Sequence, residues 1–279
     1  MYILRVNCED KSGIVAAVST CLSNAQCNIE ESAQFNDNRS GRFFMRVVYS
    51  PLTDQAHQNF CANFEYVTKN FGMSWDVHDS KSPVKTIVMV SKEDHCLHDI
   101  LYRWASENLQ IDIAAVVSNH EDCRKITQDH GLPFHYLPVG SDNKQGQEDA
   151  LRAIIGETGA ELIVLARYMQ ILSEGFCNDF SGRVINIHHS FLPGFKGARP
   201  YDQAYARGVK LIGATAHFAT SDLDEGPIIE QETVRITHAD DPKALRVIGR
   251  DTEKLVLARA INIYAQRRIF LHNSTTVIL

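Results

Sequence analysis

The stretch VINIHHSFLP, residues 184–193, combines an apolar strand with a polar end. Its valine and two isoleucines are the branched apolar residues of a strand that is buried in a sheet. Asn186 and His188 interrupt the apolar run, and a buried polar side chain without a partner is costly. Residues two apart on a strand point to the same side, so Asn186 and His188 face one space. The stretch therefore predicts a buried strand whose end carries a polar site.

Similar short apolar runs occur on both sides of this strand and alternate with amphipathic segments. This alternation predicts an α/β fold in which a doubly wound, mostly parallel sheet is covered by helices on both faces. Ligands of such sheets bind beyond the carboxyl ends of the strands, where VSN (117–119), LARYMQ (165–170) and NIHHS (186–190) are expected. The expected strands are 85–90, 113–119, 134–139, 161–166, 183–188, 211–218 and 227–234, and the amphipathic segments lie near 98–108, 122–131 and 147–159.

The first 79 residues have a different order of elements. An initial strand precedes a helix with apolar residues at four-residue spacing, then two strands, a second helix that ends at Gly72, and a last strand. This βαββαβ order predicts a ferredoxin-like domain. The expected elements are strands 2–8, 32–37, 42–50 and 73–79, a helix around residues 14–22 and a helix at 53–72. A polar, proline-containing stretch follows, so the predicted organisation is a domain at 1–78, a linker at 79–84 and a second domain at 85–279.

Composition narrows the class of protein. With 279 residues, 44% of them hydrophobic and 22% charged, the chain suits a soluble globular protein of two modest domains. It has no membrane-length apolar run and its first residues lack the features of a signal peptide, so we expect a cytoplasmic protein without a membrane partner. Seven scattered cysteines without a CxxC pair indicate reduced thiols. A net charge of −6 without a basic cluster argues against a nucleic-acid partner, and the histidines lack the spacing of a metal site.

A second set of polar residues follows strand 211–218. The loop ATSDLDEGP, residues 219–227, carries three carboxylates, Asp222, Asp224 and Glu225. With NIHHSFLP before it, the pattern resembles the folate-dependent formyltransferase family over roughly residues 85–270. The resemblance implies that Asn186, His188 and Asp224 act on the formyl group of 10-formyltetrahydrofolate.

The same resemblance implies a binding site for the pterin ring of the folate. LARYMQILS is similar to the family segment whose main-chain groups hold that ring, together with the loop that ends at Asp224. Arg167 departs from the pattern, because the transferases usually have a small residue there. The folate-binding residues so implied are Met169, Gln170, Ile171, Leu172, His217, Ser221, Asp222 and Leu223.

These residue types suit attack on a formyl carbon. The attack builds an oxyanion, which an Asn amide and an imidazolium stabilise in a pocket poor in water. A carboxylate either favours the charged form of a nearby imidazole or takes a proton from the nucleophile. The sequence leaves open how Asp224 and His188 divide these tasks. No metal and no cofactor beyond the folate itself is expected.

The acceptor of the formyl group separates the branches of the family. In the branch of the family that uses a phosphate-bearing amine, a glycine-rich loop after the first strand binds the phosphate. The corresponding stretch here, MVSKEDHCLHD (89–99), has no glycine and carries Glu93 and Asp94. A tRNA acceptor needs a basic surface, which this acidic chain lacks. Water remains as the acceptor.

HHSFLP, FKGARPYDQAY (195–205) and the N-terminal domain are similar to the hydrolytic branch of the family, over nearly the whole chain. That branch implies release of formate and tetrahydrofolate, with formate supplied for purine synthesis and the one-carbon folate pool kept in balance. Two alternatives stay open: formyl transfer to an unidentified amine, and a non-catalytic sensor of folate and amino acids.

Three further residues, His189, Lys196 and Arg199, have two interpretations each. His189 either lines the site beside the catalytic residues or has a purely structural role. Lys196 and Arg199 either meet the glutamate tail of folate or are solvated surface residues. Tyr201 is a candidate to fill the space that an amine acceptor would otherwise use.

The N-terminal segment EDKSGIVAAVS (9–19), followed by NIEESAQ, resembles an ACT domain. The resemblance implies an amino-acid effector, and we expect glycine or methionine, near Gly13 at the start of the first helix. A glycine there permits close approach of a small zwitterion to free N–H groups. The alternative is that Gly13 only shapes a turn and that the domain serves oligomerisation. In either case a homo-oligomer, a dimer or tetramer, is expected.

Overall fold

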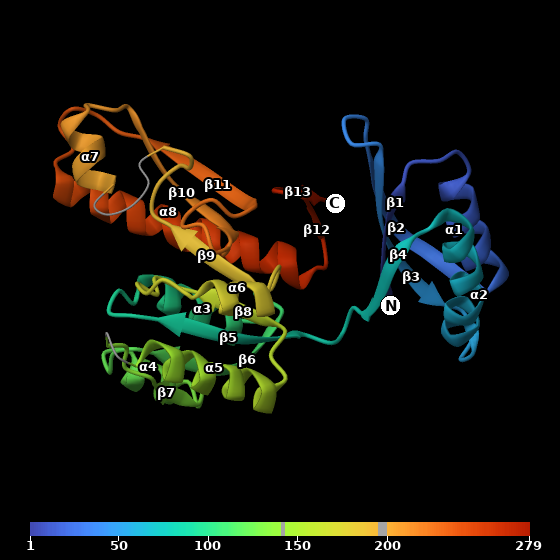
Figure 1. Cartoon of the computed structure of the whole chain (residues 1–279), viewed down its shortest axis with the longest axis horizontal. Helices are drawn as coiled ribbons and strands as arrows, with labels where there is room; N and C mark the ends of the chain where they lie inside the picture. The colour runs from blue at the N-terminus through green and yellow to red at the C-terminus, as the bar shows by residue number, and fades with distance from the viewer. Residues whose placement is uncertain (141–142, 195–199) are drawn as a thin grey trace. The chain divides into compact units, whose positions relative to one another are not determined.

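A computed structural model of the chain describes residues 1–140, 143–194 and 200–279 (Figure 1). Lys196 and Arg199 lie outside the described residues. The contacts divide the chain into two units, the first of which comprises Met1–Ser82, Gln266–His272 and Val277–Leu279. The second comprises Pro83–Ala265 and Asn273–Thr276. The break between Ser82 and Pro83 falls within the polar stretch noted in the sequence.

The first unit has the predicted ferredoxin-like order, which fits an ACT-like domain. Its antiparallel sheet has the strand order β2-β3-β1-β4. Alternate residues of β3, among them Phe43 and Met45, pack in one core with Phe60 and Phe64 of α2. The elements are β1 (Tyr2–Glu9), α1 (Ile14–Asn24), β2 (Cys27–Asp37), β3 (Arg42–Pro51), α2 (Ala56–Phe71) and β4 (Ser74–Asp79). The predicted second strand, 32–37, begins earlier, at Cys27.

The last residues of the chain form a hairpin, β12 (Ile269–His272) and β13 (Thr275–Ile278), that is not among the elements expected from the sequence. Within the first unit, the Arg5 side chain donates a hydrogen bond to the Ile269 carbonyl (2.9 Å), and the Phe44 and Phe270 rings pack edge to face at 5.7 Å. β3 is therefore buried on both faces. The sequence predicts residues 266–279 in the second domain, whereas 266–272 and 277–279 belong to the first unit because they cover this face.

The second unit is the predicted doubly wound sheet. Its strand order is β11-β10-β9-β8-β5-β6-β7, with parallel pairs from β9 to β7 and antiparallel pairs between β9, β10 and β11. The strands are β5 (Val84–Val90), β6 (Ile111–Ser118), β7 (Phe134–Tyr136), β8 (Leu162–Leu165), β9 (Val184–His188), β10 (Leu211–Phe218) and β11 (Ile228–Arg235). The predicted strand 134–139 is shorter, because only Phe134–Tyr136 pair with β6.

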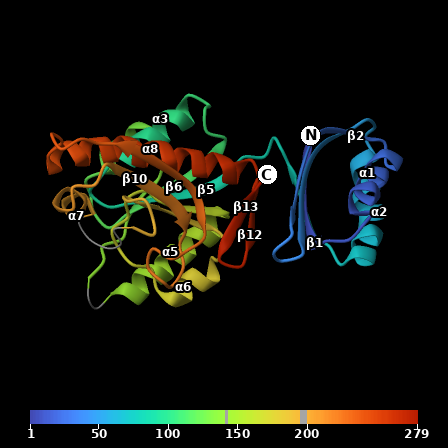
Figure 2. The same cartoon turned by 90° about the horizontal axis from the view of Figure 1, so that it is seen from above.

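Helices cover both faces of this sheet. Helices α3 and α8 lie on one side and α5 and α6 on the other (Figure 2). The helices of the unit are α3 (His95–Ala105), α4 (Arg124–Asp129), α5 (Lys144–Thr158), α6 (Glu174–Asp179), α7 (Pro200–Ala206) and α8 (Pro242–Ala265). The chain builds β5, β6 and β7 in one direction and then returns to add β8 and β9 on the other side of β5. A crevice at the carboxyl ends of β5 and β8 is the usual ligand position in such a sheet.

Hydrogen bonds at this switch point fix the segment that follows β8. The Met169 N–H donates to the Ser91 hydroxyl oxygen (3.0 Å), and that hydroxyl donates to the Asn119 side-chain oxygen (2.7 Å). The Ser91 N–H donates to the Arg167 carbonyl (3.3 Å). Residues that follow β5, β6 and β8 are thus joined at one edge of the sheet, as the sequence predicts.

Candidate active site

Two polar side chains of the site meet because β9 and β10 pair. Asn186 lies directly opposite His217 in the antiparallel register, and the Asn186 amide nitrogen lies 3.2 Å from His217 Nε2. His217 Nδ1 lies 2.9 Å from the Phe218 carbonyl oxygen, which only accepts hydrogen bonds, so Nδ1 carries the proton. Burial lowers the pKa of His217, which leaves Nε2 as the acceptor for the Asn186 amide. The strand pairing therefore fixes the orientation of the amide.

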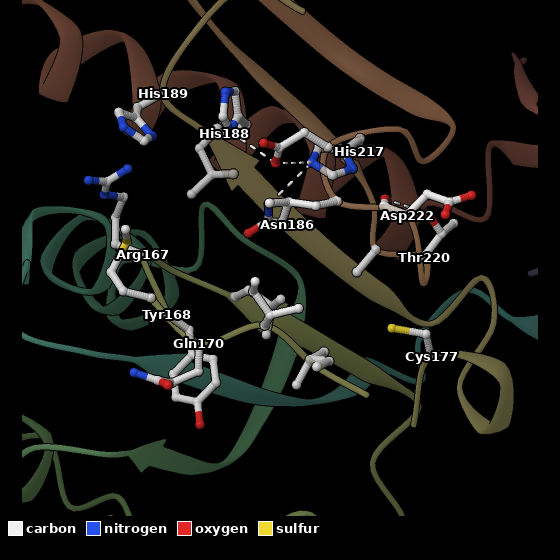
Figure 3. Close-up of a pocket in the computed structure, with 18 residues that line it drawn as sticks. Arg167, Tyr168, Gln170, Cys177, Asn186, His188, His189, His217, Thr220 and Asp222 are labelled. Atoms are coloured by element: carbon white, nitrogen blue, oxygen red, sulfur yellow. Dashed lines mark hydrogen bonds and ion pairs between the residues drawn. The ribbon is translucent and has the colours of Figure 1, made fainter. Parts of the chain in front are cut away.

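His188 and Asp224 form the second pair of the site. His188 Nδ1 lies 3.1 Å from Asp224 Oδ1, and both residues are buried, with exposed fractions of 5% and 8%. The same Oδ1 lies 4.0 Å from His217 Nε2. Figure 3 shows the side chains of Asn186, His188 and His217 converging on one side of β9. The structure thus brings together the three residues for which the sequence predicts a catalytic role.

Asp224 reaches this position through an unusual loop. Its φ is +60°, a conformation that few residues other than glycine adopt. Two residues on, Gly226 passes so close to the end of β10 that a Cβ atom there would lie 1.7 Å from the Phe218 carbonyl oxygen. The D-x-G pattern of the sequence therefore has a steric cause, because only glycine allows the loop to fold back against β10 and place the carboxylate beside His188.

A cavity of about 450 Å³ opens in front of these side chains. Most of the predicted folate-binding residues line it, and Met169, Ile171 and Leu223 are exposed apolar residues. Ser221 is the exception, since its side chain is exposed and only its neighbours Thr220 and Asp222 line the cavity. The lining residues are Leu165, Arg167, Tyr168, Met169, Gln170, Ile171, Leu172, Cys177, Asn186, Ile187, His188, His189, His217, Ala219, Thr220, Asp222, Leu223 and Asp224. An apolar cavity with a polar end suits a flat heterocycle with a reactive substituent.

Beside the cavity lies a buried hydrogen-bond network centred on Glu253 of α8, a residue that no pattern in the sequence marks as part of the site. The Tyr201 hydroxyl donates to one carboxylate oxygen (2.7 Å), and His95 Nε2 and Arg167 Nε lie 2.9 and 3.4 Å from the other. Burial alone would raise the pKa of Glu253, but the His95 hydrogen bond, the Arg167 charge and the Tyr201 hydrogen bond together lower it. Gly249 makes room for this contact, because a Cβ there would lie 1.9 Å from the Tyr201 hydroxyl oxygen.

His189 lies between the pair of His188 and Asp224 and this network. Its ring centroid is 5.1 Å from that of His188 and 5.9 Å from that of Tyr201. Burial and then the neighbouring Arg167 charge lower the pKa of His189 from 6.5 to about 3, so its ring is neutral at physiological pH. His189 lines the cavity but stands outside the Asn186, His188 and Asp224 cluster.

The candidate effector residue Gly13 lies in the first unit, directly before α1. Its φ of +94° requires glycine, and the nearest atom to a Cβ there would be a Phe71 ring carbon at 3.9 Å. The backbone conformation alone explains why this residue is glycine, whether or not a ligand binds there. The effector site stays a prediction.

One group of possible metal ligands occurs among the described residues. Its members are His95, Cys96 and Glu253, whose ligand atoms lie within 4.8 Å of one another. The Glu253 oxygens are already hydrogen-bonded, the Arg167 guanidinium next to them opposes a cation, and burial raises the pKa of the Cys96 thiol well above its ordinary value. The group is thus better explained as part of the Glu253 network. No helix in the described ranges is both long and apolar enough to traverse a membrane.

Comparison with known proteins identifies one family. The family model described as "Formyl transferase" matches residues 84–261. A formyltetrahydrofolate deformylase of Corynebacterium sp. (strain P-1) is 43% identical over 281 residues, which cover 100% of this chain and 98% of that protein. The crystal structure of the deformylase from Burkholderia mallei aligns with a TM-score of 0.95 at 47% identity and covers 100% of this chain and 99% of that one. That from Pseudomonas syringae aligns with a TM-score of 0.96 at 42% identity, covering 100% and 94%. A fold, a set of polar residues and a full-length similarity of this extent place the chain in the formyltetrahydrofolate deformylase family.

Proposed function

We propose that the chain hydrolyses 10-formyltetrahydrofolate to formate and tetrahydrofolate. The full-length similarity to proteins named formyltetrahydrofolate deformylase supports the reaction. The observation that carries the proposal within the structure is the buried contact of 3.1 Å between His188 and Asp224 at the polar end of the cavity. In this proposal the apolar part of the cavity holds the pterin, and the formyl group reaches Asn186 and His188.

The reaction needs a proton acceptor and an oxyanion site. The oxygen of water bonds to the formyl carbon while the His188 and Asp224 pair takes the proton of the water. The Asn186 amide and the His188 ring donate to the oxyanion that forms. The carbon–N10 bond then breaks, its electron pair stays on N10, and N10 takes a proton. The products are tetrahydrofolate and formate, and one proton is released at neutral pH.

The network around Glu253 favours water over an amine as the acceptor. The Glu253 carboxylate oxygens already accept hydrogen bonds from Tyr201 and His95, so they are poor partners for an incoming ammonium group. The Tyr201 ring is buried and packs near His189, in line with the prediction that it fills space next to the site. Formyl transfer to an amine remains the second candidate function.

The first test measures formate release from 10-formyltetrahydrofolate without any added amine. The wild type should release one formate per tetrahydrofolate formed. Asp224→Asn keeps the shape of the side chain but removes the carboxylate, and kcat should fall by about 10² to 10⁴. Glu225→Gln, a change in the exposed carboxylate next to Asp224, is the matched control and should keep its rate.

Three other results would contradict the proposal. Release that survives Asp224→Asn would remove this residue from the mechanism. Consumption of the cofactor only in a mixture of amines would identify a transferase. Binding of the folate without turnover would indicate a sensor.

We also propose the wider setting of this reaction. The protein acts as a homo-oligomer in the cytoplasm, its formate supports purine synthesis, and glycine or methionine acts as effector at the N-terminal unit. The similarity of this unit to ACT domains supports an amino-acid effector. Titration of both amino acids against turnover tests it, and a constant rate and KM would remove the effector from the proposal.

A further inference from the structure

Arg167 lies where two cavities of the second unit meet. Both Arg167 and His189 line the cavity of about 450 Å³ that carries the catalytic residues. Both also line a neighbouring cavity of about 470 Å³, and Figure 3 shows the Arg167 side chain extending toward His189. The remaining residues around the second cavity are Glu93, His95, Tyr201, Asp202, Arg246, Arg250 and Glu253. A group that leaves the reaction centre by this route passes Arg167.

The backbone and the side chain of Arg167 are both held in place. Its φ is +63°, a conformation that is unfavourable for arginine by about 1 to 3 kcal/mol and that concentrates at ligand sites. The Ser91 N–H donates to its carbonyl, and Glu253 lies 3.4 Å from its Nε. Within the part of the chain that the structure describes, the guanidinium donates no hydrogen bond to a protein acceptor, and its buried Nε lacks one as well. Its terminal nitrogens are therefore available to a ligand.

The other two arginines of the second cavity differ in this respect. Arg246 donates two hydrogen bonds to the Asp202 carboxylate, at 3.0 and 3.1 Å. Arg250 donates to Glu93 at 2.7 Å. Carboxylates thus accept hydrogen bonds from terminal nitrogens of both these arginines, whereas Glu253 lies only beside Nε of Arg167. Arg167 is therefore the arginine of this cavity that suits an incoming anion.

We infer that Arg167 binds the formate product and receives it from the reaction centre. The inference rests on the proposed hydrolysis, which supplies a small planar carboxylate. Once the carbon–N10 bond is broken, formate keeps both oxygens, and a guanidinium binds such a pair through two parallel N–H groups. The neutral His189 ring beside it adds no competing charge. The same positive charge repels protonated amines, so one residue both accepts the product and disfavours transfer.

The test is inhibition of hydrolysis by added sodium formate, with sodium chloride at equal ionic strength as reference. Arg167→Met should raise the inhibition constant for formate at least about tenfold, the ratio that corresponds to about 1.4 kcal/mol. Arg250→Met removes an arginine from the same cavity that is already paired, and its inhibition constant should stay within about twofold of the wild type. The inference is overturned if the inhibition constant for formate is unchanged in Arg167→Met, or if it rises equally in Arg250→Met.

The same assay separates this inference from the proposed function. A wild type that releases no formate from 10-formyltetrahydrofolate contradicts the hydrolysis itself. A wild type that hydrolyses the folate, with formate inhibition independent of Arg167, contradicts only the product site. Should Arg167→Met fail to fold by circular dichroism, Arg167→Lys takes its place. It keeps the charge but loses the paired N–H groups, so the constant should rise there too, and an unchanged value counts against the inference.

Discussion

Each side chain with a proposed catalytic role depends on one particular neighbour. Asn186 is oriented by His217, whose protonated Nδ1 is fixed by the Phe218 carbonyl. His188 is oriented by Asp224, which also approaches His217. A substitution at His217 therefore releases the orientation of the Asn186 amide, although His217 itself has no role in the proposed attack on the formyl carbon.

His189 makes the stability of the protein sensitive to acid. Its pKa is about 3 in the folded chain, below the ordinary 6.5 of the unfolded chain, chiefly because the ring is buried. Between these values the unfolded chain binds more protons, so the folded state loses stability as the pH falls below 6.5, by up to about 1.4 kcal/mol per pH unit. His189→Asn removes this contribution.

Thermal denaturation of the wild type and of His189→Asn from pH 7 to pH 4 measures the effect. The comparison uses the slope of stability against pH, which is insensitive to any constant packing loss in the variant. The variant should lose less stability than the wild type over this range. Parallel curves for the two proteins would contradict the neutral, buried state of His189.

The loop after β10 places the Asp224 carboxylate beside His188 at the end of the sheet. Asp224 with its positive φ and Gly226 against the Phe218 carbonyl are the two positions where the backbone of this loop is constrained. Neither position contributes to a core, so the constraint serves the placement of the carboxylate. The backbone of this loop, more than any single side chain in it, determines where the Asp224 carboxylate lies.

Gly226→Ala should reduce activity without removing a catalytic group. The added Cβ would lie 1.7 Å from the Phe218 carbonyl oxygen, so the loop has to move and takes Asp224 with it. A shift of about 1 Å at the carboxylate lowers kcat by about 10². Gly146→Ala on α5 is the control, because a Cβ there meets nothing within 4 Å, and its rate should match the wild type. Equal rates in both variants would show that the loop tolerates the added methyl group.

At the level of the whole molecule, much of the architecture could be predicted from periodicity. The four-residue spacing of Phe60 and Phe64 predicts α2, and strand 211–218 appears with the predicted bounds as β10. The spacing of Asn186 and His188 predicts that both face one space, and both line one cavity. These features depend on neighbours within a few positions along the chain.

Features that depend on distant partners could not be predicted in this way. Glu253 lies on a helix, and its partner His95 is 158 positions away, so no local pattern marks it as a buried charge. The φ of Arg167 follows from the turn that its neighbours form with Ser91, and the sequence shows only an arginine. The hairpin formed by β12 and β13 could not be predicted either, because the sheet face that it covers belongs to the first 82 residues.

The hairpin should stabilise the first unit measurably. Phe270 is 2% exposed and packs against Phe44, whereas the adjacent Leu271 is 43% exposed. Phe270→Ala should lower the free energy of unfolding of this unit by roughly 3 kcal/mol or more, and Leu271→Ala by less than about 1 kcal/mol.

Urea denaturation followed by tryptophan fluorescence tests this difference. In a Trp104→Phe background the remaining tryptophan, Trp75 on β4, reports on the first unit. Similar losses in the two hairpin variants would mean that the contact with Phe44 contributes little.

The hairpin also has a consequence for biosynthesis. Most of the first unit precedes the second unit along the chain, yet its sheet acquires the cover of one face only from residues 266–272. Domains usually fold in the order in which they are translated. Here the first unit waits through the synthesis of residues 83–265 with Phe44 uncovered, and the cover of its sheet forms only once residues 266–272 have been made.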